Sequence, residues 1–169
     1  FGFMYMPKIA AKYSPDDYWA IRANYSMGYR SPSIKELFFN WDHLGMFMIK
    51  GNEFLKPEKN NYVSAGVEYS NRHFFFNSTL YGNFYRKKIE GVWRIYDMQY
   101  NFEYVNLDRQ TIAGVDLLGR WTPTDWLTLN ASYSYVYVSK EKGLRINTTS
   151  PHAATAGVKY SYKNKRNYR

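Results

Sequence analysis

The stretch YWAIRANYSMGY, Tyr18 to Tyr29, alternates between apolar and more polar side chains along its whole length. One side carries Trp19, Ile21, Ala23, Tyr25, Met27 and Tyr29, and the other carries Tyr18, Ala20, Arg22, Asn24, Ser26 and Gly28. A two-residue repeat of this length predicts a β-strand with one apolar face. The stretch is about twice as long as a usual strand in a soluble sheet, and it suits a tilted strand that crosses a bilayer.

The same repeat recurs on both sides of this stretch. Long strands are predicted at residues 5–13, 62–70, 74–85, 110–121, 126–138 and 154–162, and residues 89–96 and 102–107 are predicted to form a hairpin with its turn at 97–101. This makes about eight antiparallel strands, most of them about 9 to 13 residues long, which is the length that membrane-spanning strands require.

Connections between the predicted strands alternate between short turns and long loops. Short turns are expected at residues 14–17, 71–72 and 122–125, and long loops at 30–60, at 140–150 and around the hairpin. Short turns at one end and long loops at the other are typical of up-and-down transmembrane β-barrels. Trp19, Trp121 and Trp126 lie beside the short turns, as an aromatic girdle at a bilayer surface would. The predicted fold class is therefore an all-β segment of such a barrel.

A soluble β-sheet domain is the competing interpretation, because alternation alone does not separate the two. The chain contains 18 Tyr and has a net charge of +9, which would suit tyrosines stacking on carbohydrate or on nucleic-acid bases. We interpret the basic clusters at 86–88 and 163–169 as solvated turns and tails instead, and expect no nucleic-acid partner. The sequence has no cysteine and no recognisable nucleophile or phosphate-binding motif, so we expect no enzymatic activity.

The longest segment without alternation is residues 29–58, YRSPSIKELFFNWDHLGMFMIKGNEFLKPE. Pro32 blocks continuation of a strand. Ser33 is predicted to cap a short helical turn over Ile34 to Phe39, with Glu36 in the capping-box position three residues later. We interpret the segment as a long functional loop held on a β scaffold.

Several motifs, taken in order, resemble the C-terminal barrel of TonB-dependent outer-membrane receptors. The matching stretches are 28–32 with 35–38, 51–58, 113–116, 121–129 and 150–154, which together span nearly the whole chain. The first two resemble the arginine–proline box and the asparagine–proline–leucine box of haem receptors in this family. The second box departs from the pattern, since Asn52-Glu53-Phe54-Leu55 lacks the proline, and such boxes also occur in receptors for siderophores and cobalamin.

The resemblance implies a location in the outer membrane of a Gram-negative bacterium and a barrel of about 22 strands filled by an N-terminal plug. Residues 1–169 would be a partial barrel domain that lacks the plug and the remaining strands. The implied function is energy-coupled uptake of an iron-containing ligand, haem or ferric siderophore, with cobalamin or another large nutrient as the alternative. The implied partners are outer-membrane lipid, that ligand and the TonB complex, which an absent N-terminal region would contact. No intrinsic cofactor is implied, and the open sheet edges of an isolated fragment are expected to pair with another copy.

Candidate ligand-binding residues lie in and beside the long loop. His43 is the candidate axial ligand of haem iron, within a stretch rich in aromatic and methionine residues; its alternative role is that of a packed loop histidine. Tyr29 and Arg30 are candidates to hold a propionate or a catecholate, and the alternative is a structural arginine at the barrel rim. The full set of candidates is Tyr29, Arg30, Trp41, His43, Met46, Met48 and Asn52.

Other polar residues are expected to have structural roles. His73 and His152 lie at a turn and at a strand start, without the spacing of a metal site. The alternation places five charged residues toward a lumen, where they would pair with each other or with the plug: Arg22, Glu68, Asp116, Arg120 and Lys159.

Overall fold

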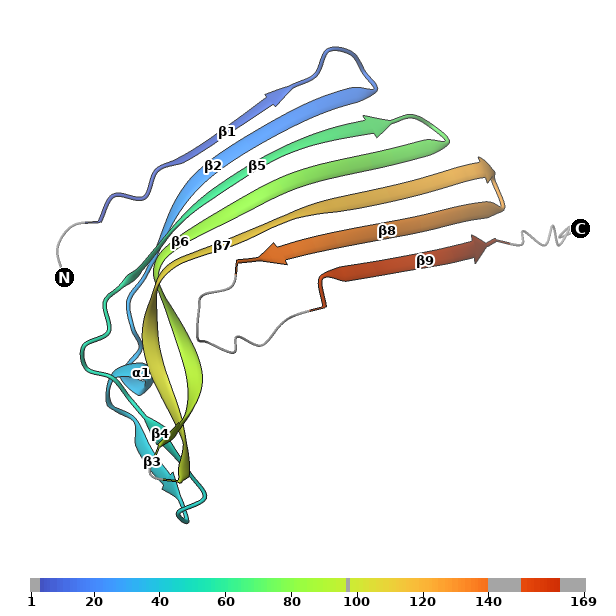
Figure 1. Cartoon of the computed structure of the whole chain (residues 1–169). Helices are drawn as coiled ribbons and strands as arrows, with labels where there is room; N and C mark the ends of the chain where they lie inside the picture. Colours follow the sequence, from blue (N-terminus) through green and yellow to red (C-terminus); the bar gives the residue numbers. More distant parts are fainter. Residues whose placement is uncertain (1–3, 97, 140–149, 162–169) are drawn as a thin grey trace, which may run out of the picture.

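The chain forms one curved sheet that carries a small lobe at one end (Figure 1). The computed structural model describes residues 4–96, 98–139 and 150–161. Its elements are β1 (Lys8–Tyr13), β2 (Trp19–Arg30), α1 (Ile34–Phe38), β3 (Asn40–His43), β4 (Phe47–Lys50), β5 (Glu58–Ser70), β6 (Phe74–Tyr96), β7 (Gln99–Thr124), β8 (Leu127–Val138) and β9 (His152–Tyr160).

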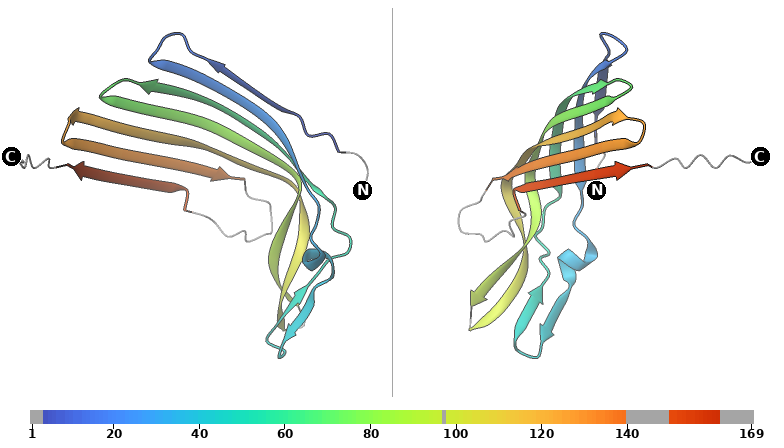
Figure 2. Two further views of the ribbon diagram at one scale, coloured as in Figure 1. Left: turned by 180° about the vertical axis from the view of Figure 1, so that it is seen from behind. Right: turned by 90° about the vertical axis from the view of Figure 1, so that its right-hand side faces the viewer.

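The long strands follow one another across the sheet in the order β1-β2-β5-β6-β7-β8-β9, each antiparallel to its neighbour. In the lobe, β4 pairs in parallel with the outer part of β7, and β3 pairs with β4. The rotated views show a single layer (Figure 2), and within the described ranges no second sheet covers either face. The prediction of an all-β antiparallel sheet with long strands is confirmed. The sheet is open in this chain, and the barrel size of about 22 strands stays a prediction.

The predicted interruptions at residues 86–88 and 108–109 are wrong. β6 and β7 run without a break for 23 and 26 residues. The cross-strand ladder passes through the basic run, since Arg86 pairs with Arg109 and Lys88 with Leu107, although Lys87 has a positive φ of 54°. The hairpin closes with Tyr96 paired to Gln99, so the predicted turn at 97–101 is also too long.

Smaller differences concern the ends of elements and the long loop. β5 begins at Glu58, and β7 continues through Thr124 after a register shift, where a turn was predicted. The helical turn ends at Phe38, close to the prediction, but the short strands β3 and β4 were not predicted. The predicted loop at 140–150 lies, except for Ser150, outside the described residues.

The two faces of the sheet differ in polarity along the long strands. Cross-strand pairing sets Ile21 beside Val67 and Leu80 beside Val115. We call this the apolar face, and its members include Ile9, Trp19, Ile21, Tyr25, Val63, Val67, Tyr69, Phe76, Leu80, Val115, Leu117, Leu129, Tyr133 and Val158. Leu80 is 59% exposed and Val158 72% exposed. An apolar face of this extent, left uncovered in the described part of the chain, is suited to contact with lipid.

The opposite, polar face carries the charged side chains that the sequence assigned to a lumen. Arg22 and Glu68 form an ion pair with a 2.5 Å Nη1–Oε2 distance, and the Ser134 hydroxyl donates to Asp116 at 2.6 Å. Around the Arg22–Glu68 pair the face is hollowed, and the hollow is lined by Ala20, Arg22, Asn24, Ser64, Gly66, Glu68, Asn77 and Thr79. The expected pairing of lumen charges is thus observed for Arg22 and Glu68.

Aromatic side chains gather on the apolar face at the short-turn end. The Trp19 and Tyr69 ring centroids are 4.8 Å apart, and those of Trp126 and Tyr160 are 5.5 Å apart. Trp121 is half exposed beside them. Amphipathic rings in this position are typical of the girdle that marks one surface of a bilayer. Among the described residues, no helix is both long and apolar enough to cross a membrane.

Candidate ligand-binding site at the outer end of the sheet

The lobe is built by the long loop and by the outer parts of β6 and β7 (Figure 1). β4 extends along β7, with Phe47 beside Tyr100 and Ile49 beside Phe102. β3 folds back on β4, with His43 beside Phe47. Most of the loop is therefore a short hairpin attached to the β6–β7 hairpin, which gives its side chains fixed neighbours.

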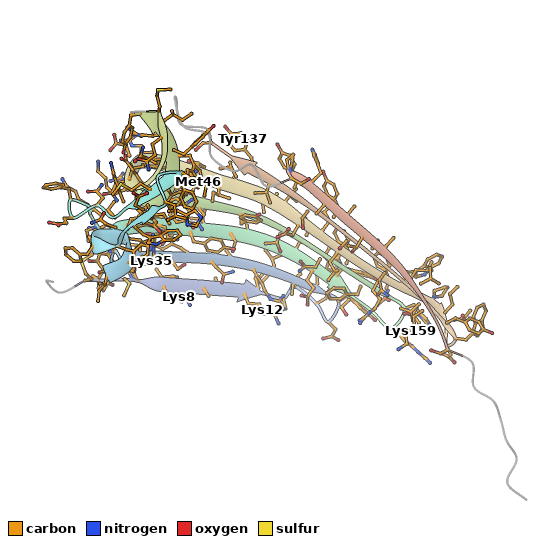
Figure 3. The ribbon with its side chains drawn as sticks, turned by 90° about the horizontal axis from the view of Figure 1, so that it is seen from below. Lys8, Lys12, Lys35, Met46, Tyr137 and Lys159 are labelled. Carbon is orange, nitrogen blue, oxygen red and sulfur yellow. The ribbon has the colours of Figure 1, made fainter. Side chains whose placement is uncertain are left out.

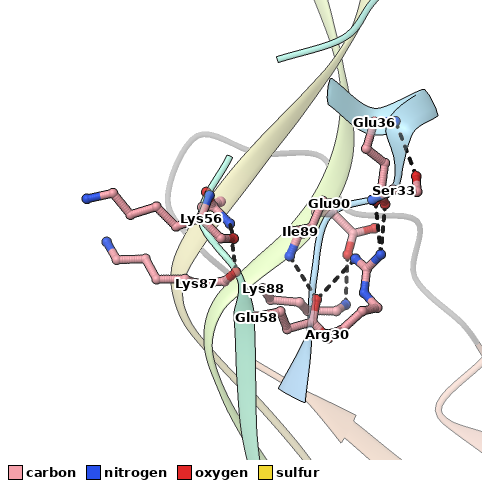
Figure 4. A network of polar contacts seen from close by, with 10 residues as sticks. Arg30, Ser33, Glu36, Lys56, Glu58, Lys87, Lys88, Ile89 and Glu90 are labelled. Carbon is pink, nitrogen blue, oxygen red and sulfur yellow. Dashed lines mark hydrogen bonds and ion pairs between the residues drawn. The ribbon is translucent and has the colours of Figure 1, made fainter. Parts of the chain in front are cut away.

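Arg30 ties the helix of the lobe to the sheet (Figure 4). Its Nη1 donates to Glu36 Oε1 at 2.9 Å and to Oε2 at 3.1 Å, and its Nη2 donates to Glu58 Oε2 at 3.2 Å. Glu58 Oε2 also accepts the backbone N–H of Ile89 at 2.9 Å. One guanidinium thus joins α1 to β2, β5 and β6. The geometry matches a structural arginine, and its role as a ligand clamp stays a prediction.

The helix begins with the capping box that the sequence predicts. The Ser33 hydroxyl accepts the Glu36 N–H at 3.2 Å, and Glu36 Oε2 accepts the Ser33 N–H at 2.7 Å. Two backbone donors at the helix start are therefore paired reciprocally. Because Glu36 also accepts from Arg30, the same carboxylate closes the cap and anchors the helix.

Burial and the surrounding donors act in opposite directions on this carboxyl group. Burial raises the pKa of Glu36, but the Ser33 hydrogen bonds and the bond and charge of Arg30 together outweigh it, so the pKa lies below its ordinary value. For Arg30, burial lowers the pKa, while hydrogen bonds to Glu36 and Glu58 and their charges raise it, with a net increase. Both shifts favour the charged pair.

The lowered pKa of Glu36 predicts an acid-sensitive lobe. A carboxyl whose folded pKa lies below its unfolded value of about 4.3 stabilises the fold above that pH and loses this contribution as pH falls through the folded pKa. We therefore expect amide hydrogen exchange in Ile34–Phe38, corrected for the intrinsic rate, to accelerate as the pH falls below about 4. Glu36→Gln should exchange faster at neutral pH and respond less to acid. An equal acid response in both proteins would contradict this role of Glu36.

The second half of the loop is fixed by two asparagines. Asn52 Nδ2 donates to the Tyr104 carbonyl at 2.9 Å, and its Oδ1 accepts the Phe54 N–H at 3.0 Å. Asn106 Oδ1 accepts the Lys56 N–H at 2.7 Å, and its Nδ2 donates to the Lys56 carbonyl at 2.8 Å. Both groups of the Asn52 amide are engaged with backbone, so the structure gives Asn52 a loop-fixing position, and ligand contact by Asn52 stays a prediction.

A continuous line of rings crosses the lobe from β3 to β7. Neighbouring ring centroids are separated by 4.9 Å for Trp41–His43, 4.9 Å for His43–Phe47 and 5.9 Å for Phe47–Trp93. The line continues through Trp93–Phe102 at 5.1 Å and Phe102–Tyr104 at 5.3 Å. We call it the aromatic row: Trp41, His43, Phe47, Trp93, Phe102 and Tyr104. Such tilted and edge contacts add to the stability of an aromatic cluster.

The aromatic row lies beyond Lys87, where a positive φ of 54° interrupts the alternation of β6. Lys87 and Asp108 are absent from the β6–β7 ladder, and the Lys88 ammonium lies 5.6 Å from the ring centroid of Tyr85 on the polar face. Beyond this point Trp93 pairs with Phe102, and Tyr104 follows two positions later on β7, so the three rings share one face of the hairpin. This two-residue spacing of aromatic residues is the sequence signal for Trp93, Phe102 and Tyr104.

The sequence-derived candidates do not form a single cluster in space. Trp41 and His43 lie together in the aromatic row. Arg30 lies in the ion-pair network, whereas Tyr29 has the opposite parity on β2 and lies beside Lys59 on the side of the apolar face. Met48 pairs with Asp42 on the other side of the β3–β4 hairpin, and Met46 is exposed near the hairpin tip (Figure 3).

The His43 side chain is half buried between two rings. Within the part of the chain that the structure describes, no hydrogen bond to its imidazole is found. No group of three or more His, Asp or Glu residues suited to a metal ion occurs there either. The arrangement can therefore offer one imidazole nitrogen and a flat aromatic surface to a ligand, and carboxylates are not gathered around it.

The chain belongs to the TonB-dependent receptor-like β-barrel family, whose family model matches residues 2–169. This is a family of receptors and transporters. It agrees with the resemblance drawn from the motifs of the sequence.

One relative aligns with nearly all of this chain, and the chain spans only a small part of that protein's length. The probable hemoglobin and hemoglobin-haptoglobin-binding protein 4 of Haemophilus influenzae is 25% identical over 94% of this chain, which spans 18% of that protein.

Solved structures agree on the fold. The siderophore receptor PirA from Pseudomonas aeruginosa matches with a TM-score of 0.72 at 17% identity, covering 83% of this chain and 29% of its own. The copper transporter OprC matches with a TM-score of 0.77 at 19% identity, covering 92% and 24%. A variant of the ferric enterobactin receptor PfeA from Pseudomonas aeruginosa matches with a TM-score of 0.73 at 18% identity, covering 92% and 25%. At these identities the likeness establishes the fold alone.

Proposed function

We propose that the chain is the part of an outer-membrane receptor that supplies one section of the barrel wall and one ligand-contacting lobe. The receptor takes up an iron-containing ligand, haem or a ferric siderophore, from outside a Gram-negative cell. The observation that carries this proposal is the aromatic row, which lies in the lobe at the long-loop end of the sheet. A ligand entering a barrel of this family would meet that surface before the polar lumen.

Haem suits the aromatic row better than a siderophore does. A porphyrin is flat and apolar, and its iron takes an imidazole nitrogen as axial ligand. His43 offers that nitrogen between Trp41 and Phe47. The ring centroid of each neighbour lies 4.9 Å from the imidazole centroid. The name of the Haemophilus influenzae relative, a probable hemoglobin-binding protein, also favours haem over siderophore. Haem is here the transported cargo, and no resident cofactor is proposed.

We assign the plug and the energy-coupling region of the receptor to segments other than residues 1–169. Energy coupling by the TonB complex and closure of the lumen by a plug are properties of the family, and we assign them to other regions of the receptor. The single-layer sheet and its exposed apolar side chains disfavour the alternative interpretation, a soluble carbohydrate- or nucleic-acid-binding domain.

Haem titration of the full-length receptor tests the proposal. We expect a Soret band shift on binding to the wild-type receptor, and a loss of that shift with affinity weakened about tenfold or more in His43→Ala, because an iron ligand is removed. His73→Ala is the control, since His73 lies in the short turn at the other end of the sheet. Ferric siderophore and cobalamin are titrated in parallel. An unchanged Soret band in His43→Ala would remove His43 from the iron, and binding of cobalamin alone would reject an iron-containing ligand.

A further inference from the structure

On the apolar face of the described strands, no charged side chain occurs between the short turns and one row of residues near the long-loop end. In the long strands, the charged side chains between the short turns and that row all have polar-face parity; they are Lys8, Lys12, Arg22, Glu68, Asp116, Arg120 and Lys159. The first charged residues with apolar-face parity are Lys59, Arg86 and Arg109. Such a sharp boundary indicates a change of environment at this level.

The three cations stand side by side on neighbouring strands. Lys59 of β5 pairs with Arg86 of β6, and Arg86 pairs with Arg109 of β7. Tyr29 of β2 completes the row beside Lys59. We call Lys59, Arg86 and Arg109 the basic row. Since adjacent strands lie about 4.8 Å apart, the basic row spans only about 10 Å at its base.

No ion pair involving the basic row is found in the described part of the chain. All three side chains are exposed, and the ion pairs found there involve other cations. The acidic residue beside the row is Asp108, next to Arg109 in the sequence, and its carboxylate pairs with Lys87, whereas Lys88 pairs with Glu90. Three adjacent positive charges repel one another, and an external anion would relieve that repulsion.

The position of the basic row matches the outer surface of a bilayer. The strand from Phe74, at the aromatic girdle, to Phe84, one step below Arg86, climbs about 33 Å at about 3.3 Å per residue. With the tilt of about 40° usual in such barrels, this gives a height of about 25 Å, the height of their apolar band. The girdle lies at the short-turn end, so the basic row lies at the opposite, outer leaflet.

We propose that the basic row binds the phosphate groups of the phosphorylated glycolipid that forms the outer leaflet of the outer membrane. Phosphates on a sugar headgroup lie at the level of the row, just above the acyl chains. Arginine can hold a phosphate oxygen pair with two parallel N–H donors, and lysine adds a point charge beside it. The proposal depends on the outer-membrane location and is independent of which ligand the receptor transports.

Binding of bisphosphorylated lipid A in mixed detergent micelles to the full-length receptor tests this proposal. The variant Lys59→Gln/Arg86→Gln/Arg109→Gln should bind about a hundredfold more weakly than wild type, given the usual contribution of each cation near an anionic lipid surface. The matched control, Lys8→Gln/Lys12→Gln/Lys159→Gln, removes the same charge from the polar face (Figure 3) and should bind as wild type does. Arg86→Lys/Arg109→Lys should keep most of the affinity.

Lipid variants and a folding control complete the experiment. Dephosphorylated lipid A and phosphatidylglycerol should both bind more weakly than bisphosphorylated lipid A. Equal binding by the basic-row variant, by dephosphorylated lipid A or by phosphatidylglycerol would overturn the proposal. Heat-modifiable gel mobility establishes that each barrel is folded. Haem titration on the same preparations separates a failure here from a failure of the proposed uptake function, because the basic row and the aromatic row have no residue in common.

Discussion

Leu80→Arg is expected to destabilise the full-length receptor in lipid bilayers by about 2–4 kcal/mol, the usual cost of a cation on the lipid face near the bilayer midplane. Leu80 lies midway along β6 between Phe74 and Arg86, between Ala65 and Val115 on the apolar face, and is 59% exposed. A long side chain there has too far to reach to either bilayer surface. The measurement is equilibrium unfolding by denaturant in bilayers of fixed composition.

Thr79→Arg is the matched control for that substitution. Thr79 precedes Leu80 in the same strand but lies on the polar face, beside Asp116. An arginine there has an acidic partner and a polar lumen, so we expect a cost of about 1 kcal/mol or less. If the two variants lost the same stability, or if Thr79→Arg lost more, the assignment of the two faces would be wrong.

Gly114→Ala should destabilise the same receptor by about 1–3 kcal/mol through overpacking. A Cβ on Gly114 would collide with the Tyr135 carbonyl oxygen of β8 and with the Tyr81 ring of β6, approaching its Cζ to 2.6 Å. The carbonyl is part of the β7–β8 ladder and cannot move aside without disturbing the pairing. Three strands in the wall therefore meet closely at this glycine.

Gly119→Ala, five positions along the same strand, separates this effect from the general cost of an added methyl group. A Cβ on Gly119 meets only the Ala131 carbonyl oxygen at 4.0 Å, which is ordinary contact. We expect this variant to be neutral or more stable by about 0.5–1 kcal/mol, since alanine restricts the unfolded chain. Equal effects at both glycines, measured in the same unfolding experiment, would contradict the close approach at Gly114.

The faces and the order of the long strands could be predicted from the sequence because the two-residue repeat is local. The alternation within Trp19 to Tyr29 is enough to show which side of this strand is apolar. The pairing with β5 places that side next to the apolar side of the neighbouring strand. The capping box of Ser33 and Glu36 was likewise predictable, since its residues are three apart.

Features that depend on distant partners could not be predicted in the same way. β3 and β4 are only four residues each, and β4 is a strand because Phe47 to Lys50 pairs with Tyr100 to Glu103. The continuity of β6 through Arg86 likewise depends on its partner Arg109, although the basic run reads locally as a turn.

The sequence drew attention to part of the aromatic row only. It singled out the loop with Trp41 and His43, but half of the row comes from Trp93, Phe102 and Tyr104 on the hairpin of β6 and β7. Arg30 appeared as a free ligand donor because its partners, Glu36 and Glu58, are fixed by tertiary structure. The ligand contacts of all seven candidates, Tyr29, Arg30, Trp41, His43, Met46, Met48 and Asn52, remain predictions.

A spin-label scan along β6 of the full-length receptor in lipid bilayers tests most directly whether the apolar face contacts lipid. The chain contains no cysteine of its own, and single labels are introduced at each position from Phe74 to Arg86 in a receptor whose cysteines elsewhere have been replaced. We predict that collision with oxygen, which concentrates in lipid, peaks at the even positions through Phe84, whereas collision with a water-soluble nickel chelate peaks at the odd positions. The oxygen peaks should end at Arg86. Oxygen peaks at the odd positions, or no alternation at all, would contradict the account.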